Sequence, residues 1–209
     1  MEIELKYRVD DRNKSEEIWH DDYLASIEEE DSRNKVKMQS LYFDTEDFDL
    51  VKNDIALRVR YEGESKVVLT LKWNGRAEEG LHRREEINIP VSGFEAGKAP
   101  NLDIFLETEM GKDLLEIVKD KPLIKIMEAN FLRRRFRVDT GDCICEVALD
   151  AGDIKTPKGD EPICELEIEL FSGKEDDVFY IGSRLEERYE LRKDNQSKFA
   201  RGLKLLGII

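Results

Sequence analysis

The N-terminal segment alternates charged and apolar residues without interruption. The charged residues are Glu2, Glu4, Lys6 and Arg8. The apolar residues between and after them are Ile3, Leu5, Tyr7 and Val9. A period of two predicts a strand with one charged and one apolar face. Two carboxylates followed by two cations on a single face also match the needs of a site for a metal ion and a phosphate chain.

Similar alternation recurs along the chain, and the charges are segregated by strand. Cations mark the segments around residues 58–60, 72 and 133–137, whereas acids mark the first half of the N-terminal strand and the segment at 165–169. One interpretation is an antiparallel sheet with its charged face in water. The other is a closed sheet whose apolar face lies outward under helices, which leaves a charged channel that ligands complete. Segregation favours the second, because solvated faces usually mix their polar residues.

Four segments carry helical periodicity. We expect helices from the N-cap Ser15 to about Ile27, and over residues 111–119, 177–191 and 197–206. The stretch 90–100, with two prolines and two glycines, predicts a loop that could separate two halves of one sheet. It is too short to demand two domains, so residues 1–209 are expected to form a single domain.

Composition limits the partners. The formal net charge of −14 argues against a nucleic-acid or anionic membrane surface, so any phosphate site must be local. No apolar run reaches the length of a membrane span, and we expect a cytoplasmic protein that is a monomer or a homodimer. Cys143, Cys145 and Cys164 form neither a zinc spacing nor a disulfide framework, and we interpret them as small buried residues.

The ordered set of motifs along the whole chain resembles one known family, the CYTH or triphosphate tunnel metalloenzymes. The matching motifs are Glu2-x-Glu4-x-Lys6, Tyr42-Phe-Asp-Thr45, Leu57-Arg-Val-Arg60, Thr70-Leu-Lys72, Arg84-x-Glu86, Arg133 to Arg137, Ala148-Leu-Asp150, Glu165-Leu-Glu-Ile-Glu169 and Ser197-Lys198. The resemblance implies an α+β fold: a closed, eight-stranded antiparallel β-barrel with a charged interior and helices packed outside.

The resemblance also assigns roles to the charged residues. The implied metal ligands for Mg²⁺ or Mn²⁺ are Glu2, Glu4, Asp150, Glu165, Glu167 and Glu169, with Glu2, Glu4 and Glu169 the best supported. The implied triphosphate-binding residues are Lys6, Arg58, Arg60, Lys72, Arg84, Arg133, Arg135 and Lys198. The implied catalytic set is Glu2, Glu4, Lys6, Asp150, Glu167 and Glu169. Arg134 falls on the apolar face by parity, unless the strand slips by one residue.

The implied activity is that of a divalent-metal-dependent triphosphatase acting on a small-molecule triphosphate. The stretch from Gly80 to Asn88 is most similar to bacterial inorganic triphosphatases, which favours hydrolysis of tripolyphosphate to pyrophosphate and phosphate. The alternatives are a class IV adenylate cyclase, a thiamine or nucleoside triphosphatase, and, from another class, a non-catalytic polyphosphate- or nucleotide-binding module. His20 and His82 form no nucleophilic triad, and we expect His82 at the tunnel mouth or the surface rather than as a general base.

Overall fold

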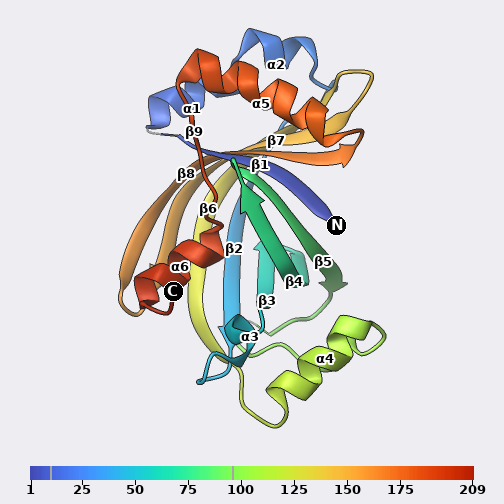
Figure 1. The fold of residues 1–209 in the computed structure, drawn as a ribbon, viewed down its shortest axis with the longest axis vertical. Helices are drawn as coiled ribbons and strands as arrows, with labels where there is room; N and C mark the ends of the chain where they lie inside the picture. The colour runs from blue at the N-terminus through green and yellow to red at the C-terminus, as the bar shows by residue number, and fades with distance from the viewer. Residues whose placement is uncertain (10, 96) are drawn as a thin grey trace.

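The computed structural model describes residues 1–9, 11–95 and 97–209 of the chain. Its strands are β1 (Glu2–Arg8), β2 (Asn34–Asp44), β3 (Ala56–Glu62), β4 (Lys66–Glu78), β5 (Leu81–Val91), β6 (Ile124–Asp139), β7 (Ile144–Thr156), β8 (Gly159–Ser172) and β9 (Arg192–Lys193). Its helices are α1 (Arg12–Trp19), α2 (Asp22–Ser26), α3 (Asp49–Lys52), η1 (Leu102–Phe105), α4 (Glu109–Val118), α5 (Glu175–Tyr189) and α6 (Lys198–Leu206). Figure 1 shows the long strands curving around a common interior, with α1, α2 and α5 at one end and α4 at the other.

The strands form a closed antiparallel barrel. Their order is β5-β4-β3-β2-β6-β7-β8-β1-β9. β1 also pairs with β5, from Glu2 opposite Arg84 to Leu5 opposite Leu81, and this pairing closes the sheet. The predicted eight-stranded barrel is therefore confirmed. The short β9, which pairs with the end of β1, is a ninth strand that the sequence did not indicate.

The apolar faces of the strands point outward, beneath the helices. Leu5 and Tyr7 of β1 are fully buried in one cluster with Ile181 and Leu185 of α5. A second cluster joins β3 and β4 to α4, and a third joins β2, β6 and β7 to α6. Fully burying a large apolar side chain stabilises a fold by about 1.5–3 kcal/mol. The charged faces consequently line the interior, and the interpretation with a solvated charged face is wrong.

Asp44 explains why the Tyr42 to Thr45 motif carries an aspartate. The side chain is fully buried and accepts hydrogen bonds from the backbone nitrogens of Thr45, Leu50 and Val51, at 2.7, 2.9 and 3.0 Å. These nitrogens belong to the turn after β2 and to the start of α3, where few backbone partners are available. Asp44 thus fixes the short helix at this end of the barrel.

The first predicted helix is wrong at its start and in its length. Asp11, not Ser15, is the N-cap, and its side chain accepts from the backbone nitrogen of Lys14 at 2.8 Å. α1 ends at Trp19, and Asp21 caps a separate helix, α2. The apolar stripe was correctly recognised, but two capping aspartates divide it. The other three helices lie within about two residues of their predicted bounds.

The predicted loop at 90–100 begins slightly later than expected, because β5 continues through Pro90 to Val91. Residue 96 of this loop lies outside the described residues.

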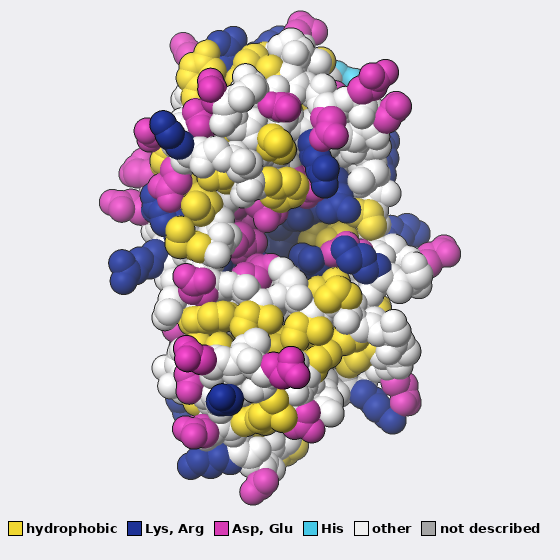
Figure 2. Space-filling model, turned by 90° about the vertical axis from the view of Figure 1, so that its right-hand side faces the viewer, with side chains coloured by type: hydrophobic (Ala, Val, Ile, Leu, Met, Phe, Trp, Pro, Cys, Tyr) yellow, Lys and Arg dark blue, Asp and Glu magenta, His cyan; other side chains and the backbone are white. Residues whose placement is uncertain are grey.

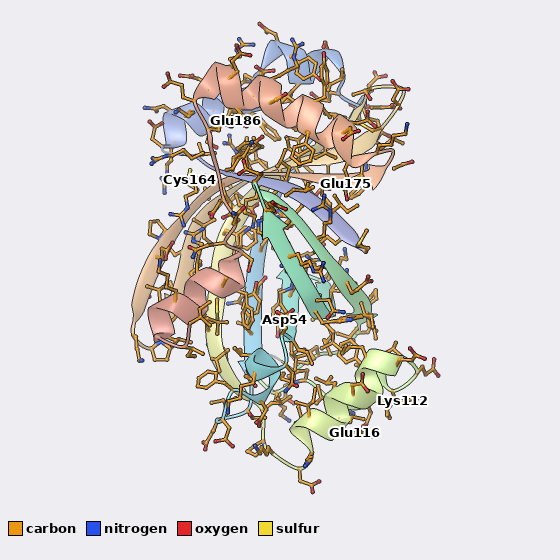
Figure 3. All side chains as sticks on the ribbon, viewed as in Figure 1. Asp54, Lys112, Glu116, Cys164, Glu175 and Glu186 are labelled. Atoms are coloured by element: carbon orange, nitrogen blue, oxygen red, sulfur yellow. The ribbon has the colours of Figure 1, made fainter. Side chains whose placement is uncertain are left out.

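Cys143 and Cys145 are buried as predicted, whereas Cys164, labelled on β8 in Figure 3, is only half-buried.

α5 approaches the barrel closely at Gly182. A Cβ atom at this position would lie 2.3 Å from Leu5 Cδ2 and 2.7 Å from Tyr7 Oη. We therefore expect Gly182→Ala to lower the free energy of unfolding by about 1–3 kcal/mol, the usual cost of overpacking a core. Urea denaturation measures the change. Gly75→Ala is the control, since nothing lies within 4 Å of its Cβ position; equal stability losses in both variants would contradict the close packing of α5 on β1.

Candidate active site

The barrel interior contains a polar cavity of about 200 Å³, called the tunnel below. Figure 2 shows a hollow bordered by Lys, Arg, Asp and Glu side chains near the middle of one face. All eight predicted triphosphate-binding residues line the tunnel, as do four of the predicted metal ligands, Glu2, Glu4, Glu167 and Glu169. The other two predicted ligands, Asp150 and Glu165, are buried in the wall and are not part of the lining.

One side of the tunnel carries a carboxylate row formed by Glu2, Glu4, Glu146 and Glu169. Strand register creates it: Glu169 of β8 lies opposite Glu4 of β1 and opposite Glu146 of β7. Glu2 follows on the same face of β1. Burial, and then the negative charges of Glu2 and Glu4, raise the pKa of Glu169 from 4.5 to about 8.

The carboxylate row offers the type of donor that a divalent cation takes. Its donors are hard oxygen atoms on three adjacent strands, the ligand type that Mg²⁺ and Mn²⁺ prefer. Burial first, and then repulsion from the neighbouring carboxylates, disfavour the charged form of Glu169. A bound cation would relieve this repulsion.

A basic wall formed by Arg58, Arg60, Arg133 and Arg135 begins opposite the carboxylate row on β3 and extends to β6, where Arg135 lies 3.4 Å from Glu146 of the row. β3, which supplies the first two, lies four strands from β8 in either direction around the barrel. The Nε atoms of Arg58 and Arg60 are buried without a hydrogen-bond partner. Burial, and then repulsion from Arg58, lower the pKa of Arg60 to about 10. Buried donors without partners are rare in folded proteins, and the two side chains that carry them line the tunnel.

Asp150, Glu165 and Glu167 form a second, fully buried acidic cluster, whose ligand atoms lie within 4.8 Å of one another. Cations of the protein already contact it. Lys198 Nζ lies 2.7 Å from Asp150 Oδ2 and 2.9 Å from Glu167 Oε1, and Lys6 Nζ lies 2.7 Å from Glu167. Burial alone would raise the pKa of Glu167, but Lys198 and Lys6 lower it well below its usual range. This cluster is therefore compensated by lysine and arginine. In the carboxylate row Glu2, Glu4 and Glu146 also lie within 4 Å of a lysine or arginine nitrogen, but among the described residues no such contact is found for Glu169.

The buried acidic cluster of Asp150, Glu165 and Glu167 anchors α6 to the barrel. Arg201 contributes to it: its Nε donates to Glu161 at 2.6 Å and its Nη1 donates to Glu165 at 3.0 Å. Lys198 and Arg201 are three residues apart on one face of α6 and both are buried. The sequence analysis missed Arg201, because strand parity says nothing about how a helix docks.

Arg134 lies outside the tunnel, as strand parity predicted. Its Nη1 contacts Glu16 at 2.5 Å and its Nη2 donates to Ser15 Oγ at 2.7 Å, both on α1. Its guanidinium also lies over the ring of Trp19. Arg133, in contrast, donates to Asp150 at 2.8 Å inside the barrel.

Three acidic lining residues were not among the predicted site residues: Glu62, Glu86 and Glu146. Parity could have found Glu146, which alternates with buried residues on β7. Glu86 belongs to the Arg84-x-Glu86 motif but was given no role. Burial alone would raise the pKa of Glu86, but the positive charges of Lys72 and Arg58 lower it to about 2. Glu62 continues the alternation of Arg58 and Arg60 on β3, so parity was the signal for this residue as well.

His82 is buried, so the alternative that placed it at the surface is wrong. It is 4 % exposed, and its Nε2 lies 2.8 Å from the carbonyl oxygen of Asp194. Burial, and then the charge of Lys6, lower its pKa. The approach of the segment after β9 buries this residue, and no local pattern indicates that approach.

The crowding of the carboxylate row predicts how stability depends on pH. Below pH 4.5 Glu169 is protonated in both folded and unfolded chains; between 4.5 and about 8 it is ionised only when unfolded. The folded state then binds the extra proton, so its stability falls as pH rises through this window. In EDTA we expect Tm to decline across it, and Mg²⁺ or Mn²⁺ to reduce the decline. Glu169→Gln should remove this part of the dependence; an unchanged profile in that variant would contradict the assignment.

A closed antiparallel barrel whose interior is lined by separate groups of acidic and basic side chains is the fold expected for a CYTH protein. The sequence model of the CYTH domain matches residues 1–203, and the chain belongs to the CYTH domain family. Among the described residues, no helix has the length and apolar character needed to cross a membrane.

Known proteins similar to this chain agree with that assignment. An inorganic triphosphatase of Haemophilus influenzae is 31 % identical over 207 residues, covering 99 % of this chain and 55 % of that protein. The chain thus spans about half the length of this relative. A Hippeastrum protein, studied as an adenylyl cyclase and reported to have a dominant triphosphatase activity, has the same fold, with a TM-score of 0.72 at 20 % identity over 100 % of this chain and 97 % of that chain. A Pyrococcus horikoshii protein matches with a TM-score of 0.58 at 21 % identity over 98 % of this chain and 99 % of the other.

Proposed function

We propose that this domain is a metal-dependent triphosphatase that hydrolyses inorganic tripolyphosphate to pyrophosphate and phosphate, with Mg²⁺ or Mn²⁺ as its cofactor. The observation that carries the proposal is that Arg58 and Arg60, each with a buried guanidinium Nε that has no hydrogen-bond partner, line the tunnel on the strand opposite β8 of the carboxylate row. A phosphate chain between the two sides would satisfy these donors. The similarity to an inorganic triphosphatase supports the substrate.

In this proposal Glu2, Glu4 and Glu169 bind the cation directly, and Glu146 lies beside them. When bound, the cation would neutralise phosphate oxygens and polarise a water. The basic wall holds the chain in line for attack, so that the bond to the terminal phosphorus breaks and pyrophosphate leaves. A carboxylate of the row accepts the proton of the attacking water.

The other predicted site residues take supporting roles. Lys72 contacts Glu2 at 2.7 Å, and Arg84 contacts Glu4 at 3.1 Å, so both lie where the metal-bound end of the chain would pass. Lys6 and Lys198 are paired with the buried acidic cluster and present only part of their charge to the tunnel. We propose that Asp150, Glu165 and Glu167 orient these lysines rather than bind the cation themselves.

A second cavity favours an alternative substrate, a triphosphate with an organic group. About 440 Å³ in volume, it shares Lys72 and Arg84 with the tunnel and is also lined by Trp73 and Phe199. Asp54, labelled in Figure 3, lies on its border. Aromatic residues beside a phosphate site could hold the ring of a nucleoside or thiamine.

Product analysis tests the proposal. The purified protein is incubated with tripolyphosphate, ATP or thiamine triphosphate in Mg²⁺ or Mn²⁺, and the products are identified by ³¹P NMR and chromatography. We expect pyrophosphate and phosphate from tripolyphosphate at the highest rate, stopped reversibly by EDTA. Cyclic AMP from ATP would support a cyclase. Binding of all three compounds without turnover would support a binding module.

A further inference from the structure

His82 is a buried side chain that bridges two parts of the protein. Its Nε2 lies 2.8 Å from the carbonyl oxygen of Asp194, and its Nδ1 lies 3.2 Å from Nη2 of Arg84. Asp194 is itself fixed to β1: its backbone nitrogen donates to the carbonyl of Lys6 at 3.0 Å, and its side chain accepts from Arg8 Nε at 2.9 Å. The imidazole therefore connects an anchored backbone position to a tunnel-lining arginine.

The two partners of His82 determine its tautomer. A backbone carbonyl can only accept a hydrogen bond, and a guanidinium can only donate one. The ring must therefore carry its proton on Nε2 and present a lone pair on Nδ1, which makes it neutral. A proton on Nδ1 would face the hydrogens of Arg84 and break the contact.

The contact with His82 sets the direction of Arg84. The same Nη2 atom lies 3.1 Å from Glu4 Oε1, so its two hydrogens can serve one carboxylate and one imidazole. Arg84 Nε lies 3.3 Å from Glu2 Oε2. Without His82, one hydrogen of this half-buried guanidinium would lose its acceptor, and the side chain would gain freedom to leave the carboxylate row.

We propose that His82 is a positioning residue: its Nδ1 accepts from Arg84 and holds that guanidinium at the carboxylate row, ready for a phosphate oxygen. The inference rests on the triphosphatase function proposed above. His82 touches neither phosphate nor metal in this role and acts only through Arg84. Its other nitrogen, bonded to Asp194, keeps the ring from turning.

Two conservative substitutions separate the two bonds of His82. In His82→Asn the amide oxygen can occupy the position of Nδ1, and in His82→Gln the amide nitrogen can occupy the position of Nε2. His82→Asn thus keeps the acceptor for Arg84, whereas His82→Gln keeps the donor to Asp194. We expect kcat/KM for tripolyphosphate to fall about tenfold more in His82→Gln than in His82→Asn, the scale of one lost bond to a charged group. The reverse order would show that His82 serves the segment at Asp194 and would overturn the proposal.

A double-mutant cycle with Arg84→Ala separates the loss of the His82–Arg84 bond from a general loss of folded protein. In the Arg84→Ala background the difference between His82→Gln and His82→Asn should disappear, because the bond that distinguishes them no longer exists. A persistent tenfold difference would overturn the proposal. Melting temperatures of all variants identify any that fail to fold.

The tautomer provides a measurement that does not need activity. Long-range ¹H–¹⁵N NMR spectra of the metal-free protein should show His82 protonated on Nε2 only, with an Nδ1 shift that changes in Arg84→Ala. A ring protonated on Nδ1, or charged at neutral pH, would overturn the proposal. Absence of tripolyphosphate turnover in the wild-type protein, with this NMR signature intact, would count against the proposed function and leave the His82–Arg84 bond standing.

Discussion

Replacing Glu4 by Gln is expected to slow metal-dependent tripolyphosphate hydrolysis by roughly a hundredfold or more, which corresponds to about 2.7 kcal/mol of lost transition-state stabilisation. Glu4 is 7 % exposed and lies opposite Glu169 in the strand register. Gln has nearly the same shape but no charge, so the row would lose one anionic ligand. Steady-state kinetics over a range of Mg²⁺ and Mn²⁺ concentrations measures the loss. We expect the same result for Glu2→Gln.

The matched control is Glu85→Gln on β5. This glutamate lies between Arg84 and Glu86, points away from the tunnel and is half-exposed beside the N-terminus. It should keep full activity. Full activity in Glu2→Gln and Glu4→Gln as well would remove the metal assignment from the carboxylate row.

The second large effect is expected at the basic wall. Arg133→Ala should weaken triphosphate binding or turnover by about 2–4 kcal/mol, as for a charge-assisted contact in a partly desolvated site. Arg135→Ala should act in the same direction, since Arg135 also lines the tunnel. Removal of Arg133 also leaves Asp150 and Glu167 short of one cation, so folding must be checked by circular dichroism and thermal melting.

Arg134→Ala is the control for this prediction, because Arg134 is the chain neighbour of Arg133 on the opposite face of β6. Its contacts are with α1, so the substitution should change stability more than catalysis. A large catalytic loss at Arg134 with none at Arg133 would show that the strand is shifted by one residue. Small, equal losses of activity at all three arginines would show that the arginines of β6 do not bind the triphosphate.

The alternation of residues predicted strands with one charged and one apolar face, and the resemblance to the CYTH family predicted that these strands close into a barrel around the charged face. Side chains on a strand alternate between faces, so the motif at Glu2 to Lys6 and the parity at Arg133 fix which side chains share the interior. The resemblance to the CYTH family supplied the direction of closure, because the residues alone left open whether the charged face met water. Burial of Leu5 and Tyr7 under α5 settles that point.

The parts that the sequence did not predict depend on contacts between segments far apart in the chain. The pairing of Glu165 with Lys198 and Arg201 requires α6 to dock on β8. The burial of His82 requires the residues after β9 to pass over it. The division of the first helix depends on two caps, whose aspartates are indistinguishable in sequence from solvated ones. Parity sorts residues between faces, but it does not say which charges pair.

Locating the metal is the most direct test of the proposed tunnel chemistry. Crystals of the protein with Mn²⁺ and a non-hydrolysable tripolyphosphate analogue, measured at the manganese absorption edge, would give the ion's position. We predict an anomalous peak coordinated by carboxylate oxygens of Glu2, Glu4 and Glu169, with the phosphate chain against Arg58 and Arg60. A peak at Asp150, Glu165 and Glu167, or a phosphate chain bound outside the barrel, would contradict the account.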